Sequence, residues 1–315
     1  MRYACLGTQI VNEIHFADGS EKRGIMGGTI FALAGLQQYC ADSILFADRG
    51  SDWEQYFGKW FRDNGISEAG LDPIVQRQTF SELHYLPTGE WKENMFFGPA
   101  DRKAENLRLT EQMLDALTDE TRGVYLYESI HNAAFWALVE KRLPAGGPKR
   151  MLELLTAECV AENLEPFCRN ILPLIDIYSL NRTEAYPFFG VTSEQKAVER
   201  ILEIGKPCYF RCGKRGAYMI MDGRAVFVPS FTVRRLEDEI DPTGCGNCST
   251  AAALYGFAEG YGAEEIGAIA SLAAAYNVMQ YGPNPVFTAQ TRADSLAWAL
   301  RESKNYMQQK GDGLQ

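Results

Sequence analysis

A glycine-containing segment in the last third of the chain holds the residue types best suited to chemistry. Residues 239–260 read E-I-D-P-T-G-C-G-N-C-S-T-A-A-A-L-Y-G-F-A-E-G, and a helix is expected from about Asn247. The backbone N–H groups of Gly244, Cys245 and Gly246 precede this helix, whose N-terminus carries partial positive charge. The segment therefore predicts a phosphate-binding loop. The alternative is a helix start whose glycines serve close packing.

A second polar motif is N-R-T-E at 181–184, directly after the predicted strand 176–180. Asn181 and Glu184 are three residues apart, and hard cations such as Mg²⁺ prefer oxygen ligands and keep part of their water shell. The motif predicts a hydrated Mg²⁺ site beside phosphate oxygens. The alternative is a helix cap in which Glu184 reaches back to Asn181.

Two glycines also lie between the predicted strands 208–212 and 217–221. Gly213 and Gly216 lie in the turn C-G-K-R-G-A at 212–217, which is a candidate contact for a nucleotide. The alternative is an ordinary hairpin turn.

Cysteine and histidine give little evidence for a metal. Cys245 and Cys248 have C-x-x-C spacing, but no second Cys or His pair stands at zinc-site distance. A thiol at a helix N-terminus is expected to have a lowered pKa and to be sensitive to oxidation. The histidines His15, His84 and His131 are too far apart in the sequence to suggest a metal cluster.

Composition excludes several classes of function. The 315 residues carry a formal charge of −10, which argues against nucleic acid or an anionic membrane as a partner. No apolar run approaches the roughly 20 residues needed to span a bilayer, so we expect a cytoplasmic protein. The sequence contains no G-x-x-x-x-G-K-[ST], no strand followed by G-x-G-x-x-G and no G-x-S-x-G elbow.

Strands and helices alternate along most of the chain, which predicts an α/β fold with a doubly wound, mostly parallel sheet and helices on both faces. The predicted strands are 3–7, 43–47, 123–127, 151–155, 176–180, 208–212 and 217–221. The predicted helices are 29–39, 53–64, 132–142, 193–204, 263–281 and 292–308.

Two stretches depart from this alternation and read as β-hairpins. Residues 10–26 contain the turn signal A-D-G-S at 17–20, and residues 74–98 contain T-G-E at 88–90 between alternating aromatic and polar residues. They predict a small β lid outside the main sheet. The alternative is a set of edge strands on the main sheet.

Taken in this order, the motifs resemble those of the PfkB (ribokinase-like) carbohydrate kinase family. The resemblance rests on the glycine pair at 27–28, N-R-T-E at 181–184, G-K-R-G-A at 213–217, D-P-T-G-C-G-N at 241–247 and Asn277 near the end of a small-residue helix. It covers nearly the whole chain, and the segment in the 240s is specific.

The resemblance implies a doubly wound α/β core, residues 1–9, 27–73 and 99–315, and a small β lid, residues 10–26 and 74–98, over the acceptor site. It implies transfer of the ATP γ-phosphoryl group to a hydroxyl of a sugar, polyol or nucleoside. The implied cofactors are ATP and Mg²⁺, with a monovalent cation as a further candidate.

The resemblance also assigns residues to roles. At the transferred phosphate it implies Gly244, Cys245, Gly246 and Asn247. Along the nucleotide and its ion it implies Asn181, Glu184, Gly213, Gly216, Asp241, Thr243 and Asn277, with Glu184 acting on Mg²⁺ through water. At the acceptor it implies Asn12, Gly27 and Gly28.

Three positions depart from the family pattern. Asn12 stands where the family has an acceptor-binding Asp, and Ala32 stands where an Asn commonly follows the glycine pair. Asn247 replaces the Asp that accepts the proton of the acceptor hydroxyl. Asp241 and Asp238 are the nearest other carboxylates in the sequence.

These departures leave two functions open: a slow or unusual kinase, and a non-catalytic ATP- or ligand-binding regulatory protein. A lid face carrying Phe80, Tyr85 or Trp91 also predicts a homodimer formed through the lid.

Overall fold

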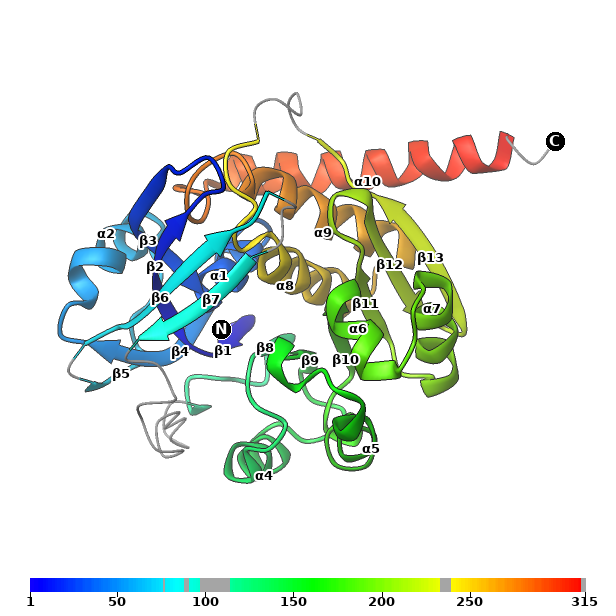
Figure 1. Ribbon diagram of the computed structural model, residues 1–315, viewed down its shortest axis with the longest axis horizontal. Coiled ribbons are helices and arrows are strands. Elements are labelled where there is room, and N and C mark those ends of the chain that lie inside the picture. The colour runs from blue at the N-terminus through cyan, green and yellow to red at the C-terminus, as the bar shows by residue number, and fades with distance from the viewer. Residues whose placement is uncertain (76, 88–90, 97–113, 233–238, 313–315) are drawn as a thin grey trace.

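The chain folds around a nine-stranded sheet (Figure 1). The computed structural model describes residues 1–75, 77–87, 91–96, 114–232 and 239–312. From one edge to the other, the strands are β13 (Arg224–Pro229), β12 (Gly216–Met221), β11 (Cys208–Arg211), β10 (Ile177–Asn181), β9 (Lys149–Glu153), β8 (Gly123–Leu126), β1 (Tyr3–Leu6), β4 (Ser43–Gly50) and β5 (Leu71–Val75). Neighbours from β11 to β5 pair in parallel, and β12 and β13 extend the sheet as an antiparallel hairpin.

Helices cover both faces of this sheet, so the predicted doubly wound architecture is confirmed. Along β1, Tyr3 and Cys5 belong to the hydrophobic core of one face and Ala4 and Leu6 to that of the other, because successive side chains of a strand point to opposite faces. The helices of the first core are α1 (Thr29–Gln37), α8 (Cys245–Ala258), α9 (Ala263–Asn277) and α10 (Ala289–Asp312). Those of the second core are α4 (Ala133–Arg142), α6 (Arg182–Phe189) and α7 (Glu194–Ile204).

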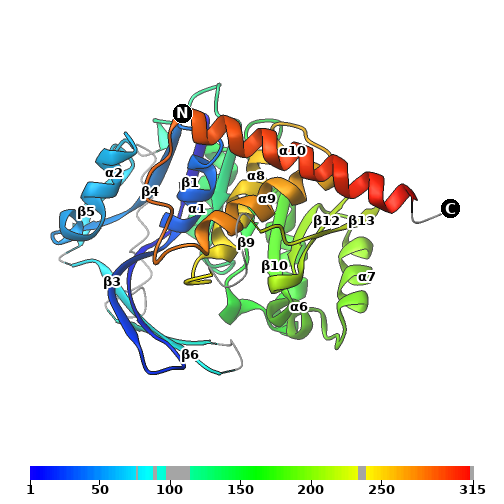
Figure 2. The ribbon, with the colours of Figure 1, turned by 90° about the horizontal axis from the view of Figure 1, so that it is seen from above.

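A second, four-stranded sheet stands apart from the first. Its strands, in spatial order, are β3 (Glu21–Gly28), β2 (Gln9–His15), β6 (Thr79–Tyr85) and β7 (Trp91–Phe96). The outer pairs are antiparallel, while β2 and β6 run parallel. In Figure 2 this small sheet projects from the side of the molecule opposite to α10. The predicted sheet outside the main one is therefore present, and its action as a lid remains a prediction.

The structure differs from the predicted elements mainly at their ends. The predicted helix 53–64 is a π-helical turn (Glu54–Gly58) followed by the short α2 (Lys59–Asp63). Residues 74 and 75 extend β5, which pairs with β4 in the main sheet. The half-exposed β13 has no counterpart among the predicted strands, because its side chains do not alternate clearly between buried and exposed. The predicted turn at 88–90 lies outside the described residues.

Shorter helical segments complete the connections. They are α5 (Leu164–Pro166), the π-helical turn Phe167–Ile171 and the 3₁₀ turns Thr156–Glu158, Ala161–Asn163, Leu172–Leu174 and Gly213–Arg215. Among the described residues, no helix is both long enough and apolar enough to cross a membrane.

Candidate functional site

The turn that leads into α8 is held by the side chain of Asp241. Its Oδ1 accepts hydrogen bonds from the N–H of Thr243 at 2.9 Å and from the hydroxyl of Thr243 at 2.6 Å. Gly244 follows with a φ of 77°, the left-handed region that favours glycine. The helix begins at the next residue, Cys245, two residues before the start predicted from the sequence.

The backbone N–H groups in the first turn of α8 differ in their hydrogen bonds. The N–H of Cys245 donates to the carbonyl of Pro242 at 3.1 Å, and the helical bonds begin with the N–H of Cys248, which donates to the carbonyl of Gly244 at 2.9 Å. Gly246 and Asn247 lie between them, where a helix offers its N–H groups no carbonyl four residues back. Of the three donors that the resemblance implied, Cys245 is therefore already engaged within the turn.

Both glycines of this turn lie against other side chains. A β-carbon at Gly244 would stand 2.1 Å from the ring of Phe31 in α1, and one at Gly246 would stand 2.3 Å from Nη1 of Arg211. The close-packing interpretation is thus correct for both positions. Anion binding at this turn remains a prediction.

Arg211 brings a positive charge to this turn. It ends β11, and its Nη1 lies 2.7 Å from Oε1 of Glu153 while its Nη2 lies 3.3 Å from Oε2 of Glu184. Burial lowers the pKa of the guanidinium, but Glu153 and Glu184 outweigh it and raise the pKa above its ordinary value. Arg211 is therefore charged, and its Nε has no hydrogen-bond partner among the described residues.

A hydrogen-bonded chain connects Asn247 to the same carboxylates. The amide Nδ2 of Asn247 donates to the hydroxyl of Tyr125 at 3.3 Å, and that hydroxyl donates to Oε2 of Glu153 at 2.7 Å. Burial, together with the charge of Glu153, raises the pKa of Tyr125 well above its ordinary range. The phenol thus stays protonated and orients the amide of Asn247.

The N-R-T-E motif forms the helix cap that was its alternative interpretation. Oδ1 of Asn181 accepts the N–H of Glu184 at 3.1 Å, and Oε2 of Glu184 accepts the N–H of Asn181 at 2.6 Å. Oε1 of Glu184 accepts the hydroxyl of Thr156 at 2.8 Å. Burial raises the pKa of Glu184, and the nearby charge of Arg211 opposes that shift. Both oxygens of Glu184 are hydrogen-bonded, so a role on Mg²⁺ through water remains a prediction.

The turn at 212–217 connects β11 to β12, as a hairpin turn would. Gly213 has a φ of 63°, and Gly216 has a φ of 131°. A β-carbon at Gly216 would stand 2.1 Å from the carbonyl oxygen of Val228 in β13. Gly216 is thus required for packing between β12 and β13, and a nucleotide contact at Gly213 and Gly216 remains a prediction.

Asn277, at the end of α9, lies against the glycine turn. Its Nδ2 donates to the carbonyl of Thr243 at 2.9 Å, which supplies a partner for this buried amide. Oδ1 of Asn277 and Oδ2 of Asp241 are buried and have no hydrogen-bond partner among the described residues. The N–H of Asp241 donates to the carbonyl of Val278, which follows Asn277, at 3.2 Å. The two unpartnered oxygens, on Asp241 and Asn277, therefore lie where the end of α9 contacts the segment that leads into α8.

The pKa values of the two thiols of the C-x-x-C pair are raised, which is opposite to the lowered pKa expected from the sequence. Burial raises the pKa of Cys245 to about 12, although a hydrogen bond from Asn277 opposes the shift. Burial also raises the pKa of Cys248 well above its ordinary value. Both thiols lie in the first turn of α8, where burial is the largest cause of the raised pKa.

The predicted acceptor residues gather where the small sheet meets α1. Asn12 is buried, and a β-carbon at Gly27 would stand 2.2 Å from its Nδ2. Gly28, with a φ of 64°, precedes α1. Since Phe31 of α1 lies against Gly244, the structure brings the early glycine pair and the turn of α8 to one region.

The small sheet also contacts the turn directly. The hydroxyl oxygens of Tyr85 and Thr243 are 2.8 Å apart. Phe80 packs edge-to-face on Tyr56 with ring centroids 5.6 Å apart, and joins the main core. These two aromatic residues do not form the exposed lid face that was expected, because each has a partner within the chain. The side chain of Trp91 lies outside the described residues.

His15 and His84 lie together, which corrects the expectation that the histidines are too far apart to cluster. The two residues are directly opposite in the parallel pair of β2 and β6, and their rings stack with centroids 4.5 Å apart. Sequence distance is misleading here because strand register, not chain separation, decides which side chains meet.

Four residues of this region were not predicted from the sequence: Tyr125, Glu128, Glu153 and Arg211. Oε2 of Glu128 is buried without a partner among the described residues, and burial raises the pKa of this carboxyl. Glu153 and Arg211 end β9 and β11, and Glu128 follows β8. A polar residue after each apolar run was the available signal, because ligands of open α/β sheets bind at the carboxyl ends of strands.

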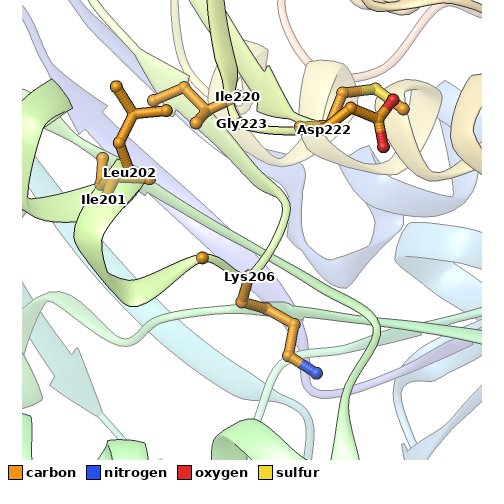
Figure 3. Close-up of a pocket in the computed structure, with 8 residues that line it drawn as sticks. Ile201, Leu202, Lys206, Ile220, Asp222 and Gly223 are labelled. Carbon is orange, nitrogen blue, oxygen red and sulfur yellow. The ribbon is translucent and has the colours of Figure 1, made fainter.

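A small pocket elsewhere is not part of this site. Figure 3 shows it between the end of α7 and the turn from β12 to β13, with Ile201, Ile220 and Asp222 in its lining. The side chain of Lys206 points away from Ile220 and Asp222, and its Nζ donates to the carbonyl of Ile175 at 2.9 Å. The pocket lies beside the first residues of β11, whereas the last residue of that strand, Arg211, lies against the glycine turn.

Comparisons with known proteins agree with this geometry. Residues 132–289, half of the chain, match the model of the pfkB family carbohydrate kinases. The matched range contains N-R-T-E, the turn at 212–217 and the glycine turn before α8. The chain therefore belongs to the pfkB family of carbohydrate kinases. A comparison with curated proteins finds no match in sequence.

Solved structures support the same fold. A probable sugar kinase from Rhizobium etli is 18% identical with a TM-score of 0.72, and the match covers 94% of this chain and 98% of that one. A nucleoside kinase from Burkholderia thailandensis in complex with inosine is 17% identical with a TM-score of 0.71, covering 94% and 95%. A putative ribokinase II from E. coli in complex with ATP and Mg²⁺ is 16% identical with a TM-score of 0.71, covering 96% and 99%.

Proposed function

We propose that this carbohydrate kinase transfers the γ-phosphoryl group of ATP to a hydroxyl of a small sugar, polyol or nucleoside, with the phosphates bound at the turn before α8. The observation that carries the proposal is the meeting of three features at Gly246: a glycine turn, a helix N-terminus and the charged guanidinium of Arg211. Phosphoryl transfer depends mainly on positioning and on stabilising negative charge, and this arrangement supplies both.

The backbone donors at Gly246 and Asn247 would hold the transferred phosphate, with Gly244 and Cys245 shaping the turn. Arg211 would add a fixed positive charge, since Glu153 and Glu184 hold its guanidinium in place. Oriented donors and cations of this kind cost no reorganisation during the reaction. We also assign Gly213, Gly216 and Thr243 to the path of the nucleotide.

Mg²⁺ would be held beside the phosphates through its water shell, with Asn181 and Glu184 ordering the waters. The fit rests on Glu184, a buried carboxylate in the first turn of α6, whose hydrogen bonds to Thr156 and to the N–H of Asn181 fix its position. Bound Mg²⁺ neutralises phosphate charge and favours displacement at the γ-phosphorus.

A monovalent cation would fit behind the turn, at Asp241 and Asn277. Each contributes a buried oxygen that has no partner among the described residues, and a buried oxygen without a partner is costly. Burial raises the pKa of Asp241, against the hydrogen bonds from Thr243, so its charge is unfavourable without a cation. A bound ion would stabilise the turn from the side away from the phosphate.

The acceptor would bind between the small sheet and the turn, where Asn12, Gly27, Gly28 and Glu128 offer polar and close-packed surfaces. The small sheet acts as a lid in this proposal, and its hydrogen bond from Tyr85 to Thr243 supports that role. Assembly into a homodimer through the lid stays a prediction, and two of the aromatic residues on which it rested, Phe80 and Tyr85, have partners within the chain.

Asn247 would orient the acceptor hydroxyl without taking its proton, because an amide is not a base near neutral pH. Asp241 is not a substitute base, since it is 1% exposed and hydrogen-bonded to Thr243. Asp238 lies outside the described residues. The reaction can proceed when the proton leaves late, but it loses the factor of roughly 10²–10⁴ that a general base supplies. We therefore propose a slow kinase.

A regulatory protein that binds ATP without turnover is the second candidate, favoured by Asn247 and Ala32 at positions where the family pattern has other residues. The two are separated by measuring ADP release from ATP in the presence of a panel of sugars, polyols and nucleosides. Stimulation by one compound supports the kinase. ATP binding without stimulation by any compound supports the regulatory protein.

A further inference from the structure

The outer face of the small sheet carries a cluster of histidine and glutamate side chains. Glu13 and His15 of β2 stand directly opposite Glu82 and His84 of β6 in the parallel register. Asn12 precedes Glu13 and therefore points to the other face, toward the acceptor region. We call Glu13, His15, Glu82 and His84 the His–Glu cluster.

The donor atoms of this cluster are close enough to share an ion. One ligand atom each from Glu13, His15 and Glu82 lie within 4.8 Å of one another. The ring of His84 stacks on that of His15 with an interplanar angle of 4°, and its Nε2 lies 3.5 Å from Oε2 of Glu82. All four side chains are partly exposed, so an ion can reach them from water.

The charged side chains in and around the His–Glu cluster have an excess of negative charge, which favours a cation. Arg23 lies 3.2 Å from Glu21 and 3.9 Å from Glu13, and Glu21 lies 3.7 Å from Nδ1 of His15. Lys92 of β7 stands opposite His84. The three carboxylates of Glu13, Glu21 and Glu82 therefore outnumber the two cationic side chains, Arg23 on β3 and Lys92 on β7. Two of those carboxylates, Glu13 and Glu82, stand directly opposite each other, an arrangement that is destabilising in a sheet.

We propose that Glu13, His15 and Glu82 bind a divalent transition-metal ion of the zinc class. Imidazole nitrogen and carboxylate oxygen suit such ions, whereas Mg²⁺ and Ca²⁺ prefer oxygen ligands alone. Ligand atoms on tetrahedral Zn²⁺ are about 3.4 Å apart for bonds of about 2.1 Å. Small rotations of the exposed side chains reach that spacing, a water molecule completes the tetrahedron, and the stacked ring of His84 steadies His15.

The bound ion connects β2 to β6, the strands that carry Asn12 and Tyr85. It therefore stiffens the small sheet from its outer face without touching the acceptor region. Because no step of phosphoryl transfer uses this face, the site stands independently of the proposed kinase activity.

The test is titration of Zn²⁺ alone into the full chain, followed by calorimetry and by the thermal unfolding midpoint. We expect one ion per chain and a rise in the midpoint, since an ion that binds only the folded state stabilises it. His15→Ala and Glu82→Gln are expected to weaken binding at least tenfold. His131→Ala, which removes an exposed histidine outside the small sheet, is the control and is expected to change nothing.

Co²⁺ in place of Zn²⁺ distinguishes this site from adventitious binding by the free thiols. The expected spectrum lacks thiolate-to-metal charge transfer. Absence of binding, a thiolate spectrum, or binding that both His15→Ala and Glu82→Gln leave intact would overturn the proposal. Each of these readouts is independent of ATP and of the acceptor, so kinase failure and site failure remain distinguishable.

Discussion

The guanidinium of Arg211 lies directly beside the α-carbon of Gly246: a β-carbon there would stand 2.3 Å from Nη1. The contact is rigid because Glu153 and Glu184 hold the two terminal nitrogens. A fixed cation beside a helix N-terminus favours an anion more than either feature alone. An anion at Gly246 would meet the backbone donor and the guanidinium together.

Gly246→Ala is expected to weaken binding of Mg-ATP at least tenfold. The added methyl group would force Arg211 away from its carboxylates and would narrow the space beside the backbone donors. Calorimetry with Mg-ATP measures the effect. Gly262→Ala is the matched control, because its β-carbon meets only the flexible carboxylate of Glu265, at 3.6 Å. If Gly246→Ala binds Mg-ATP as tightly as the wild type, the phosphates do not bind at this turn.

Arg211→Lys is expected to lower kcat by about 10²-fold, the usual cost of removing one transition-state donor, while the affinity for ADP changes little. Lysine keeps the charge but cannot bridge two carboxylates as the planar guanidinium does. Steady-state kinetics and ADP calorimetry measure the two effects. Arg200→Lys, which alters an exposed ion pair with Glu203 in α7, is the control. Parallel losses of ADP affinity, kcat and thermal stability would show a purely structural role.

Asp241→Asn is expected to raise the free energy of unfolding at pH 7 by roughly 1 kcal/mol in buffer without alkali cations. Burial raises the pKa of Asp241 in the folded state, so folding favours its protonated form. Below the ordinary pKa of about 3.9 the charge of Asp241 does not lower the free energy of unfolding. The loss of stability grows as pH rises from there through the raised pKa of the folded state. Urea unfolding from pH 4 to pH 8 should show the two proteins diverging with rising pH.

Addition of K⁺ should stabilise the wild type at pH 7 and leave Asp241→Asn unchanged, because the variant lacks the charge that binds the ion. Tetramethylammonium, which is too large for the site, is the control salt. If neither K⁺ nor Na⁺ stabilises the wild type, the proposed monovalent cation site does not exist.

Local features of the fold and site could be predicted from the sequence. The glycine pair at 27–28 and the turn at 241–247 were both expected to open helices, and α1 and α8 begin there. Backbone conformation at glycine and helix capping depend on a few neighbouring residues, so the sequence contains enough information. The alternation of apolar runs likewise predicted the layers of the main sheet.

Contacts between strands could not be predicted in the same way. Tyr125, Glu153 and Arg211 end up hydrogen-bonded because β8, β9, β10 and β11 are adjacent, and that order is decided by packing of the whole sheet. His15 and His84 meet for the same reason. For the thiol of Cys245 the local argument gave the wrong direction of the pKa shift, because burial, which depends on the folded chain, raises that pKa.

Tyr85→Phe is expected to raise KM for the best acceptor of the panel about fivefold, the equivalent of one hydrogen bond of about 1 kcal/mol. The substitution removes the contact between the small sheet and Thr243. Tyr306→Phe is the control, since it loses a hydrogen bond to the carbonyl of Phe227, far from the site. An unchanged KM in Tyr85→Phe would mean that this contact is not used when the acceptor binds.

Asn247→Asp is expected to raise kcat on the true acceptor at least tenfold, because the carboxylate can take the proton that the amide cannot and a general base is worth roughly 10²–10⁴-fold. Affinity for ATP should stay within about twofold, since the backbone donor at this position is unchanged. Asn305→Asp, which adds the same charge at an exposed position of α10, is the control.

The carboxyl group introduced by Asn247→Asp would lie beside the hydroxyl of Tyr125, whose proton already serves Glu153. The charge of Glu153 then raises the pKa of the introduced carboxyl group, so the gain in kcat should grow as pH rises and the variant should lose stability over the same range. A pH profile of kcat with parallel urea unfolding checks both. Brisk turnover by the wild type and slower turnover by the variant would make Asn247 an adapted acceptor contact. If both proteins bind ATP and neither transfers phosphate to any acceptor, the chain is a regulatory protein.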